Sequence, residues 1–535
     1  MNPVAVASPL LSATEVGLAT GHRGGNALDA ALAAAAMLTV AYPASCAIGG
    51  DLLALVRDPD GQVRFINASG RSFRATDPDA IRSRYDTMPT HGPLSVTVPG
   101  LVGGWDALWR LGASLPWKDL LAPAARAAHD GVPVSPGLAA SIAETVPLLR
   151  DYPDLATVLA PASEPLTTGR TLRQPRLGHT LDQIADGGAG ALYVGDLADA
   201  LCTGLAARGV PITREDLAAF EVVQSSALTC DVGPWRVSAG RPNSQAYLVP
   251  RLLGMLEATG DPGVALHRRI PADKLALAFY LSQRERDSVL ADPAAMTADV
   301  AELLTEHSLR QFAFEVLEHP SHTLPRAGSR RPTGDTVAVV AADADGRSVS
   351  LIQSLFNGFG SLVLEPATGI LMHDRGAGFV LDPDSPNALA PSKRPMHTLS
   401  PVLAERVDGT ERLAVGTMGG HHQPQILTQV LSQLFAGATA QEAVRRPRMT
   451  VSAWEDWESA DTVSWESDLD PDVIGEIAAF PGTPVQVPPL DSRMGHAHAI
   501  RVSSRKWRPD VGTDPRADGM ARQVIDAGPT GSRPA

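Results

Sequence analysis

The chain has 535 residues, of which 44% are hydrophobic and 19% are charged, a composition typical of a globular protein with one large or two ordinary domains. Its formal net charge is −14 and no cluster of lysine and arginine reverses that sign locally, so we expect neither nucleic acid nor a membrane surface as a partner. Three widely spaced cysteines give no disulfide framework, and the first residues lack the regions of a secretory signal. We therefore expect a cytoplasmic protein.

The first predicted element is a helix from Asn26 to Tyr42. Its sequence is dominated by alanine, Asn26 is a favourable N-cap after two glycines, and Pro43 ends the run. The run is apolar but short, and it carries Asp29. We therefore expect a helix packed inside the protein rather than a membrane span.

A hairpin and a helical region follow. The strands of the hairpin are predicted at Leu52–Arg57 and Gln62–Ile66, joined by the turn sequence Asp-Pro-Asp-Gly. From Gly100 onward, periodic apolar positions predict helices, including Trp117–Asp130 and Pro136–Leu149, as far as about residue 320. The middle of the chain is expected to be mostly helical.

Strand patterns resume at Thr336, where a Pro- and Arg-rich segment over residues 325–333 gives way to an apolar run. The later predicted elements are strands at Thr336–Ala342, Arg347–Ser354 and Gly360–Leu364, helices at Gln423–Phe435 and Thr439–Arg445, and a strand at Ala497–Val502. Beyond about Ser504 the sequence is polar and rich in proline and glycine, which indicates a poorly ordered tail over residues 505–535. Strands on both sides of a helical block predict a single α+β unit whose sheets pair both halves of the chain.

Thr336 is the first candidate for chemistry. A threonine at the start of a chain carries a base in its own α-amino group, whose ordinary pKa of ~7.7–8.0 leaves part of it neutral near pH 7. Thr336 would become such a nucleophile if the chain were cut after Asp335, and Gly334 would allow the strained backbone that self-cleavage needs. On local sequence alone, the ordinary first residue of a buried strand remains the alternative.

Gly419 and Gly420 form the second candidate. They lie just before a predicted helix, where unobstructed backbone N–H groups and the helix dipole suit an oxyanion, although a plain turn fits the same sequence. The loop from Arg394 to Pro401 holds several hydroxyl groups between prolines and is either a pocket lining or a turn.

Two histidine pairs raise the question of a metal site. They are His421-His422 and His496-x-His498, and no further ligand spacing accompanies them. We interpret them as structural or pocket histidines and expect no metal at the site.

The order of these motifs resembles the gamma-glutamyltransferase family of N-terminal-nucleophile hydrolases over nearly the whole chain. The matching segments are GGNALDAALAAAAMLTVAYPASCAIGGD near the start, TVPGLVGGW at 97–105, Asp335-Thr336 with Asp345-Gly346, SLFNGFG at 354–360, GILMHDRGAGF at 369–379, HTLSP at 397–401 and TMGG at 417–420. Together these motifs are specific to the family.

The resemblance implies a four-layer αββα sandwich and a proenzyme that cuts itself before Thr336. The segments 1–335 and 336–535 would stay interleaved as two subunits, and a homodimer is compatible with the family. Thr336 would be both nucleophile and base, the amides of Gly419 and Gly420 would form the oxyanion hole, and the hydroxyl of Ser354 would support the nucleophile. The implied reaction passes through an acyl-enzyme and needs no cofactor.

Departures from the family pattern concern the substrate. The acidic residue that holds the α-amino group in γ-glutamyl-transferring members is Gly378 here, and the serine pair that binds the α-carboxylate is His397-Thr398. The family's binding arginine is not in register, although Arg71 and Arg74 lie close by. Arg375 instead adds a bidentate donor.

This pattern predicts a small-molecule amide substrate whose acyl group carries a carboxylate and no free amine. It is similar to the amidohydrolase branch of the family, which includes oxamate amidohydrolase and cephalosporin-type acylases. True γ-glutamyl transfer is the first alternative. An unprocessed, non-catalytic binding homologue is the second.

Overall fold

The structure is a computed structural model that describes residues 3–259, 270–319, 324, 335–453, 458–504 and 507–523. Gly334, the whole Pro- and Arg-rich segment 325–333, and residues 524–535 lie outside the described residues, so the expectations placed on them stay predictions.

The predicted strand that begins at Thr336 lies in a seven-stranded antiparallel sheet. Its strands, in spatial order, are β20 (Met520–Gln523), β1 (Val4–Ser8), β9 (Asp335–Asp343), β10 (Ser348–Phe356), β2 (Asp51–Arg57), β3 (Val63–Ala68) and β6 (Val223–Ser226). β9 lies between β1 and β10, with Val6 opposite Ala341 and Ile352 opposite Ala338. Strands that precede Thr336 in the chain and strands that follow it therefore lie side by side in one sheet.

A second, six-stranded sheet packs against the first. Its order is β19 (Asp510–Thr513), β18 (Ala497–Ser503), β14 (Glu411–Thr417), β13 (Val402–Arg406), β8 (Trp235–Ala239) and β7 (Leu228–Val232). Three small sheets lie outside the sandwich: β4 (Val132–Pro133) with β5 (Thr171–Leu172), β11 (Leu364–Glu365) with β12 (Ile370–Leu371), and β15 (Met449–Val451) with β16 (Val463–Glu466) and β17 (Pro484–Val487).

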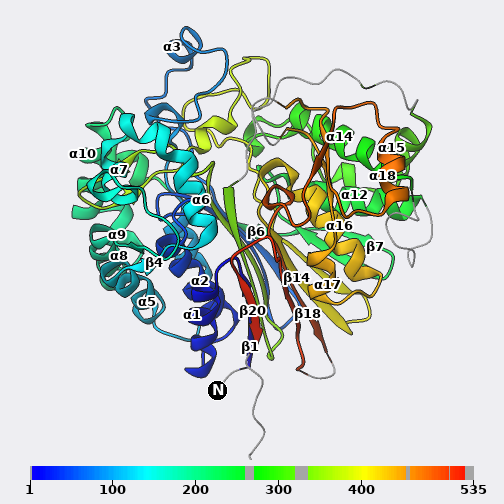
Figure 1. Cartoon of the computed structure of the whole chain (residues 1–535), viewed down its shortest axis with the longest axis horizontal. Helices are drawn as coiled ribbons and strands as arrows, with labels where there is room; N and C mark the ends of the chain where they lie inside the picture. Colours follow the sequence, from blue (N-terminus) through cyan, green and yellow to red (C-terminus); the bar gives the residue numbers. More distant parts are fainter. Residues whose placement is uncertain are drawn as a thin grey trace, which may run out of the picture.

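Helices cover the two outer faces of the paired sheets (Figure 1). Those on the side of the seven-stranded sheet are α1 (Leu11–His22), α2 (Ala27–Ala41), α4 (Leu101–Arg110), α5 (Trp117–Asp130), α6 (Pro136–Thr145), α7 (Pro153–Leu159), α8 (Pro175–Gly187), α9 (Gly190–Tyr193), α10 (Asp196–Ala206) and α11 (Arg214–Ala218), with the short α3 (Pro78–Arg82) above them. Those on the other side are α12 (Leu248–Ala258), α14 (Ala272–Val289), α15 (Glu306–Glu318), α16 (Gln423–Phe435), α17 (Ala440–Arg445) and α18 (Pro471–Ile477). The predicted α+β sandwich of four layers is confirmed.

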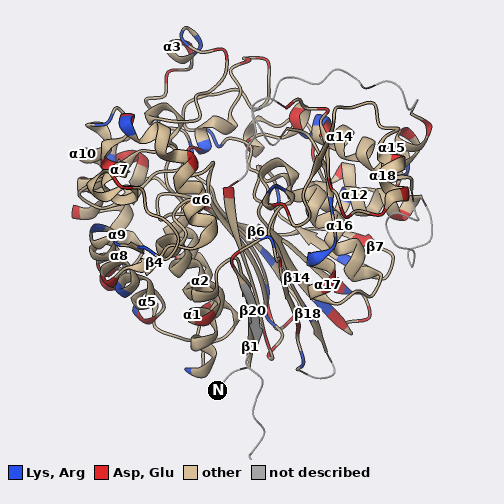
Figure 2. Ribbon diagram, viewed as in Figure 1, with Lys and Arg blue, Asp and Glu red and all other residues tan. Residues whose placement is uncertain are grey.

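The interior layer between the sheets is built from aliphatic side chains. Small residues such as Ala5, Ala7 and Ala338 share one buried cluster with Leu53 and Leu403, which lets the two sheets approach closely. Charged residues lie mainly on the outer helices and loops in Figure 2, with acidic and basic residues mixed. The sandwich is therefore held by apolar packing at its centre.

The predicted packing helix is confirmed as α2, which is buried along its whole length. The Asn26 side chain accepts from the Leu28 N–H at 2.9 Å, and Asp29 accepts from the Asn26 N–H at 2.7 Å, which closes a capping box. Within the described ranges, no helix combines the length and the apolar character needed to cross a bilayer.

Two predictions about local structure were wrong. The segment Gly360–Leu364 is a turn, because Phe359, Gly360 and Leu362 have positive φ, and only Leu364 enters a strand. The middle of the chain is mostly helical as predicted, although β6, β7 and β8 also supply strands to the two sheets.

The second concerns the tail. Part of it is ordered, since β19 and β20 pair with β18 and β1. The polar composition of the tail gave no strand pattern, because these strands gain their backbone partners only in the folded sheets.

Candidate active site

Thr336 lies near the start of β9, beside Ser354 on β10. The two hydroxyl oxygens are 3.1 Å apart, and each is 2.7 Å from the carbonyl oxygen of Asp335. The Phe356 N–H donates to the Ser354 hydroxyl at 2.7 Å, next to a bulge in the pairing of β9 with β10. Both side chains are buried, so two hydroxyls converge on the peptide bond between Asp335 and Thr336.

The side chain of Asp335 accepts a short hydrogen bond from the Ser45 hydroxyl. Burial raises the pKa of Asp335 to about 6, although the bond from Ser45 opposes the shift. The residue before the predicted cut is therefore held in a site that disfavours its charged form.

Gly419 and Gly420 begin the turn that leads from β14 into α16. Their φ angles are 131° and 49°, which favour glycine, and neither N–H donates to an acceptor within the described part of the chain. The Gly420 carbonyl accepts from Gln245 Nε2 at 2.9 Å, and the same nitrogen lies 2.9 Å from the Thr398 carbonyl oxygen. The glycine pair therefore lies beside the Thr398 loop with its amides available.

Arg375 is buried at the centre of this region. Its guanidinium carbon lies 3.8 Å from the centroid of the Phe356 ring, and Nη1 donates to the Thr398 hydroxyl at 3.3 Å. Burial lowers the pKa of Arg375 to about 10, so it stays cationic near neutral pH. Its Nε and one Nη have no hydrogen-bond acceptor among the residues that the structure describes. This cation can accept a further anionic partner.

Asp51 connects Arg375 to two histidines. Its Oδ2 lies 3.1 Å from His397 Nε2, 3.4 Å from His373 Nδ1 and 3.8 Å from Arg375 Nε. Burial alone would raise the pKa of Asp51, but the facing histidines outweigh it and hold the pKa well below the ordinary value. Because Asp51 lies opposite Ser354 in the sheet, its carboxylate is placed close to the Thr336 pair.

Sequence reasoning missed Asp51 and His373 as members of the site. One local signal was their position inside quoted motifs, Asp51 after a glycine pair and His373 two residues before Arg375. Asp51 is also a charged residue directly before the apolar run Leu52–Val56 of a predicted strand.

His397 uses both ring nitrogens within the protein. Its Nδ1 accepts from the Leu399 N–H at 3.3 Å, which leaves Nε2 to donate to Asp51. Burial and the charge of Arg375 lower the pKa of His397 to about 4, so the ring is neutral near pH 7. Thr398 and His397 thus contact the charged groups, while a direct contact of His397 with substrate stays a prediction.

Arg71 and Gly378 lie at the edge of this group. Arg71 is half exposed, donates to the Ser392 carbonyl at 2.9 Å and lies 3.9 Å from Asp292. The Gly378 carbonyl accepts from Asn387 at 2.7 Å, and a Cβ added to Gly378 would lie 3.8 Å from Arg375 Cδ. Gly378 is therefore the position from which a new side chain would reach the neighbourhood of Arg375.

The histidine pairs lie in separate surroundings. His496 is 2.9 Å from the Ser492 hydroxyl, and His498 Nδ1 is 2.6 Å from the Thr513 hydroxyl, both within the C-terminal half of the sandwich. His422 lies 3.3 Å from the Ser452 carbonyl oxygen. The hydrogen bonds of His496, His498 and His422 fit the structural interpretation of these histidines.

Comparison with known proteins gives a consistent result. The family model described as gamma-glutamyltranspeptidase matches residues 13–524. The chain is 34% identical over 522 residues to the oxamate amidohydrolase proenzyme of Klebsiella pneumoniae, covering 95% of this chain and 96% of that protein. It is 32% identical over 525 residues to the glutathione hydrolase-like YwrD proenzyme of Bacillus subtilis, with coverage of 96% and 97%.

A solved structure shares the whole architecture. The crystal structure of cephalosporin acylase from Bacillus halodurans superimposes with a TM-score of 0.87 at 30% identity, covering 97% of this chain and 96% of that chain. The gamma-glutamyltranspeptidase of Helicobacter pylori has the same type of fold at 23% identity, with a TM-score of 0.54 over 59% of this chain.

Proposed function

The chain belongs to the gamma-glutamyltranspeptidase family, and on this premise we propose that it is a self-processing amide hydrolase with Thr336 as its nucleophile. Its preferred substrate is a small amide whose acyl group carries a carboxylate. The observation that carries the substrate assignment is the buried guanidinium of Arg375, which has two N–H-bearing nitrogens without an acceptor among the described residues.

Maturation begins with the two hydroxyls at the Asp335 carbonyl. The Thr336 oxygen attacks the carbonyl carbon, and the Ser354 hydroxyl, 2.7 Å from the carbonyl oxygen, stabilises the negative charge that develops there. The hydroxyl proton of Thr336 passes to the amide nitrogen as the C–N bond breaks, which leaves an ester on Thr336 and a free α-amino group. Water hydrolyses the ester and releases Asp335 as the last residue of the first subunit.

Turnover uses the new amino terminus. The α-amino group takes the proton from the Thr336 hydroxyl, whose oxygen attacks the substrate amide carbon. The amides of Gly419 and Gly420 stabilise the oxyanion, and the leaving amine or ammonia receives the proton. Water then attacks the acyl ester and restores the hydroxyl.

The two subunits stay associated after the cut because each sheet of the sandwich contains strands from both of them. Strands β1, β2, β3 and β6 precede Thr336, whereas β10 and β20 follow it in the same sheet. Separating the two segments would expose both inner layers.

Substrate choice rests on the charges around Arg375. A carboxylate can pair bidentately with the guanidinium, which Phe356 and Thr398 hold in place. Asp51, at 3.8 Å, limits the net positive charge and orients Arg375, so we assign Asp51 and His397 to positioning rather than to substrate contact. The absence of an acidic side chain at Gly378 disfavours a substrate ammonium.

Purified protein assayed with oxamate, glutaryl amides and a γ-glutamyl anilide tests this proposal. We expect release of ammonia or amine from the first two classes and little turnover of the third. Turnover of the γ-glutamyl substrate alone would instead favour the transferase alternative.

Processing is tested separately on a denaturing gel. Two bands, the smaller starting at Thr336, support the mechanism. A single full-length band after long incubation would favour the non-catalytic binding homologue.

A further inference from the structure

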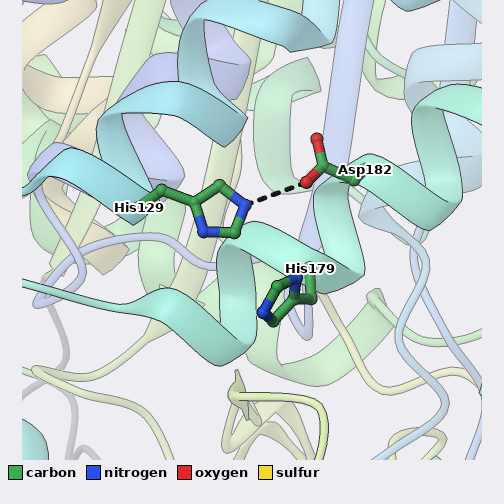
Figure 3. Close-up of side chains that lie close together, drawn as sticks. All are labelled: His129, His179 and Asp182. Carbon is green, nitrogen blue, oxygen red and sulfur yellow. Dashed lines mark hydrogen bonds and ion pairs between the residues drawn. The ribbon is translucent and has the colours of Figure 1, made fainter.

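A cluster of three metal-ligating side chains lies on the helical layer formed by α5 and α8. His129 comes from α5, and His179 and Asp182 come from α8 (Figure 3). Their donor atoms all lie within 4.8 Å of one another, the one such group found in the described part of the chain. We propose that this cluster binds a divalent transition-metal ion of the zinc class.

The two helices present these side chains together for a local reason. His179 and Asp182 are three residues apart, so they lie on one face of α8. His129 is in the last turn of α5, with Nε2 2.9 Å from Asp182 Oδ2 and its ring centroid 4.8 Å from that of His179. Three donors therefore converge from two rigid helices.

Gly178 makes the approach of His129 feasible. A Cβ added at Gly178 would lie 2.7 Å from His129 Cε1 and 2.8 Å from both ring nitrogens. Any larger residue would push the imidazole away from α8. The packing of the helices is thus shaped around the position of this ring.

The surroundings of the cluster contain charges of both signs. The carbonyl end of α5, at Asp130, carries the negative end of the helix dipole, which favours a nearby cation. Asp186, one turn beyond Asp182, is paired with Lys118 at 2.6 Å, and Arg173 donates to the His129 carbonyl at 3.4 Å. Among the three ligands only Asp182 carries a negative charge, so a bound divalent ion would leave the cluster with a net positive charge.

The donor set selects the kind of ion. Two imidazoles and one carboxylate suit zinc, nickel or copper, whereas magnesium and calcium prefer oxygen ligands. A tetrahedral ion with ligands about 2.1 Å away places neighbouring donors about 3.4 Å apart, so His179 must move by roughly 1 Å. His179 and Asp182 are exposed, which makes this adjustment easy.

A plain ion pair between His129 and Asp182 is the competing explanation. That pair joins the helices without any ion and gives His179 no role beyond ring contact. The proposal differs because it makes all three side chains necessary for one bound ion.

The test uses tag-free, chelator-treated full-length protein titrated with zinc chloride in a calorimeter and heated with and without zinc. We expect one saturable site per chain, an unfolding temperature that rises with zinc concentration, and no response to magnesium. His179→Ala should weaken zinc binding at least about tenfold while leaving the metal-free unfolding temperature unchanged, because the His129–Asp182 bond remains.

His307→Ala is the matched control, since His307 is also an exposed helical histidine. It should bind zinc as the unaltered protein does. Absence of a saturable site in the unaltered protein, or unaltered zinc binding in His179→Ala, would overturn the proposal. Neither result depends on amide hydrolysis, so the metal site and the proposed function fail independently.

Discussion

Two buried ionic networks in this molecule differ in how completely their cations are paired. Around Arg516, the guanidinium donates from Nε, Nη1 and Nη2 to Glu466, Asp514 and two backbone carbonyls. Around Arg375, Asp51 is the nearest anion at 3.8 Å, and two guanidinium nitrogens have no acceptor within the described ranges. A saturated network links parts of a fold, whereas an unsaturated buried cation is suited to an anionic ligand.

The strongest test concerns the proposed nucleophile, Thr336. Thr336→Ala should abolish both self-cleavage and turnover, because it removes the attacking oxygen and keeps the fold. The gel should show one band of full length. Thr336→Ser, which keeps a hydroxyl, is the matched variant and should still process; cleavage in Thr336→Ala would contradict the assigned nucleophile.

Exchanging the two arginines for methionine separates binding from stability. Arg516→Met should lower the free energy of unfolding by about 3–5 kcal/mol, because it leaves the buried carboxylate of Glu466 without its cationic partner. Arg375→Met should change stability by about 1 kcal/mol or less but lower kcat/KM for carboxylate-bearing amides about 100-fold. Denaturant unfolding and steady-state kinetics on both variants measure this contrast. Equal losses of stability in the two variants would contradict the difference between the two networks.

Asp51→Asn probes the positioning of Arg375. Without the carboxylate, the guanidinium loses the charged group that orients it, and we expect this loss to outweigh the gain in net positive charge and to raise KM for a carboxylate-bearing amide about tenfold. An uncharged amide of similar size should be affected much less. If both substrates lose the same factor in kcat instead, Asp51 serves the reaction centre and not Arg375.

The buried carboxyl groups of Asp335 and Asp514 should make stability depend on pH with opposite sign. The pKa of Asp335 is raised to about 6 by burial, so its contribution to stability is present at low pH and lost as the pH rises through 6. Burial would raise the pKa of Asp514, but Arg448 and Arg516 lower it, so its contribution is lost on acidification.

Unfolding of the uncut Thr336→Ala protein measured across pH isolates the first effect. Adding Asp335→Asn should remove the loss of stability between about pH 4 and pH 6 that Asp335 causes. An unchanged pH profile in the double variant would assign that loss to other groups.

Local sequence determined the elements whose signals are contained in a short segment. The helix capped by Asn26 and the hairpin around the Asp-Pro-Asp-Gly turn formed where propensity and capping predicted them. The order of glycine, threonine and hydroxyl motifs also identified the family, because each motif is contiguous. The strands at β6–β8 and β19–β20 were missed because their stability comes from partners far away in the chain.

Only the tertiary structure decided which charges meet. Asp51 and His397 are 346 residues apart in the chain, yet their side chains lie 3.1 Å apart, and Gly178 brings His129 onto a helix that the sequence did not link to it. The sequence by itself identified the family and predicted Thr336 as the nucleophile, with Ser354 and the glycine pair as its partners. The pairing of Arg375 was decided by the fold, because electrostatic interactions depend on distance and burial that no local pattern contains.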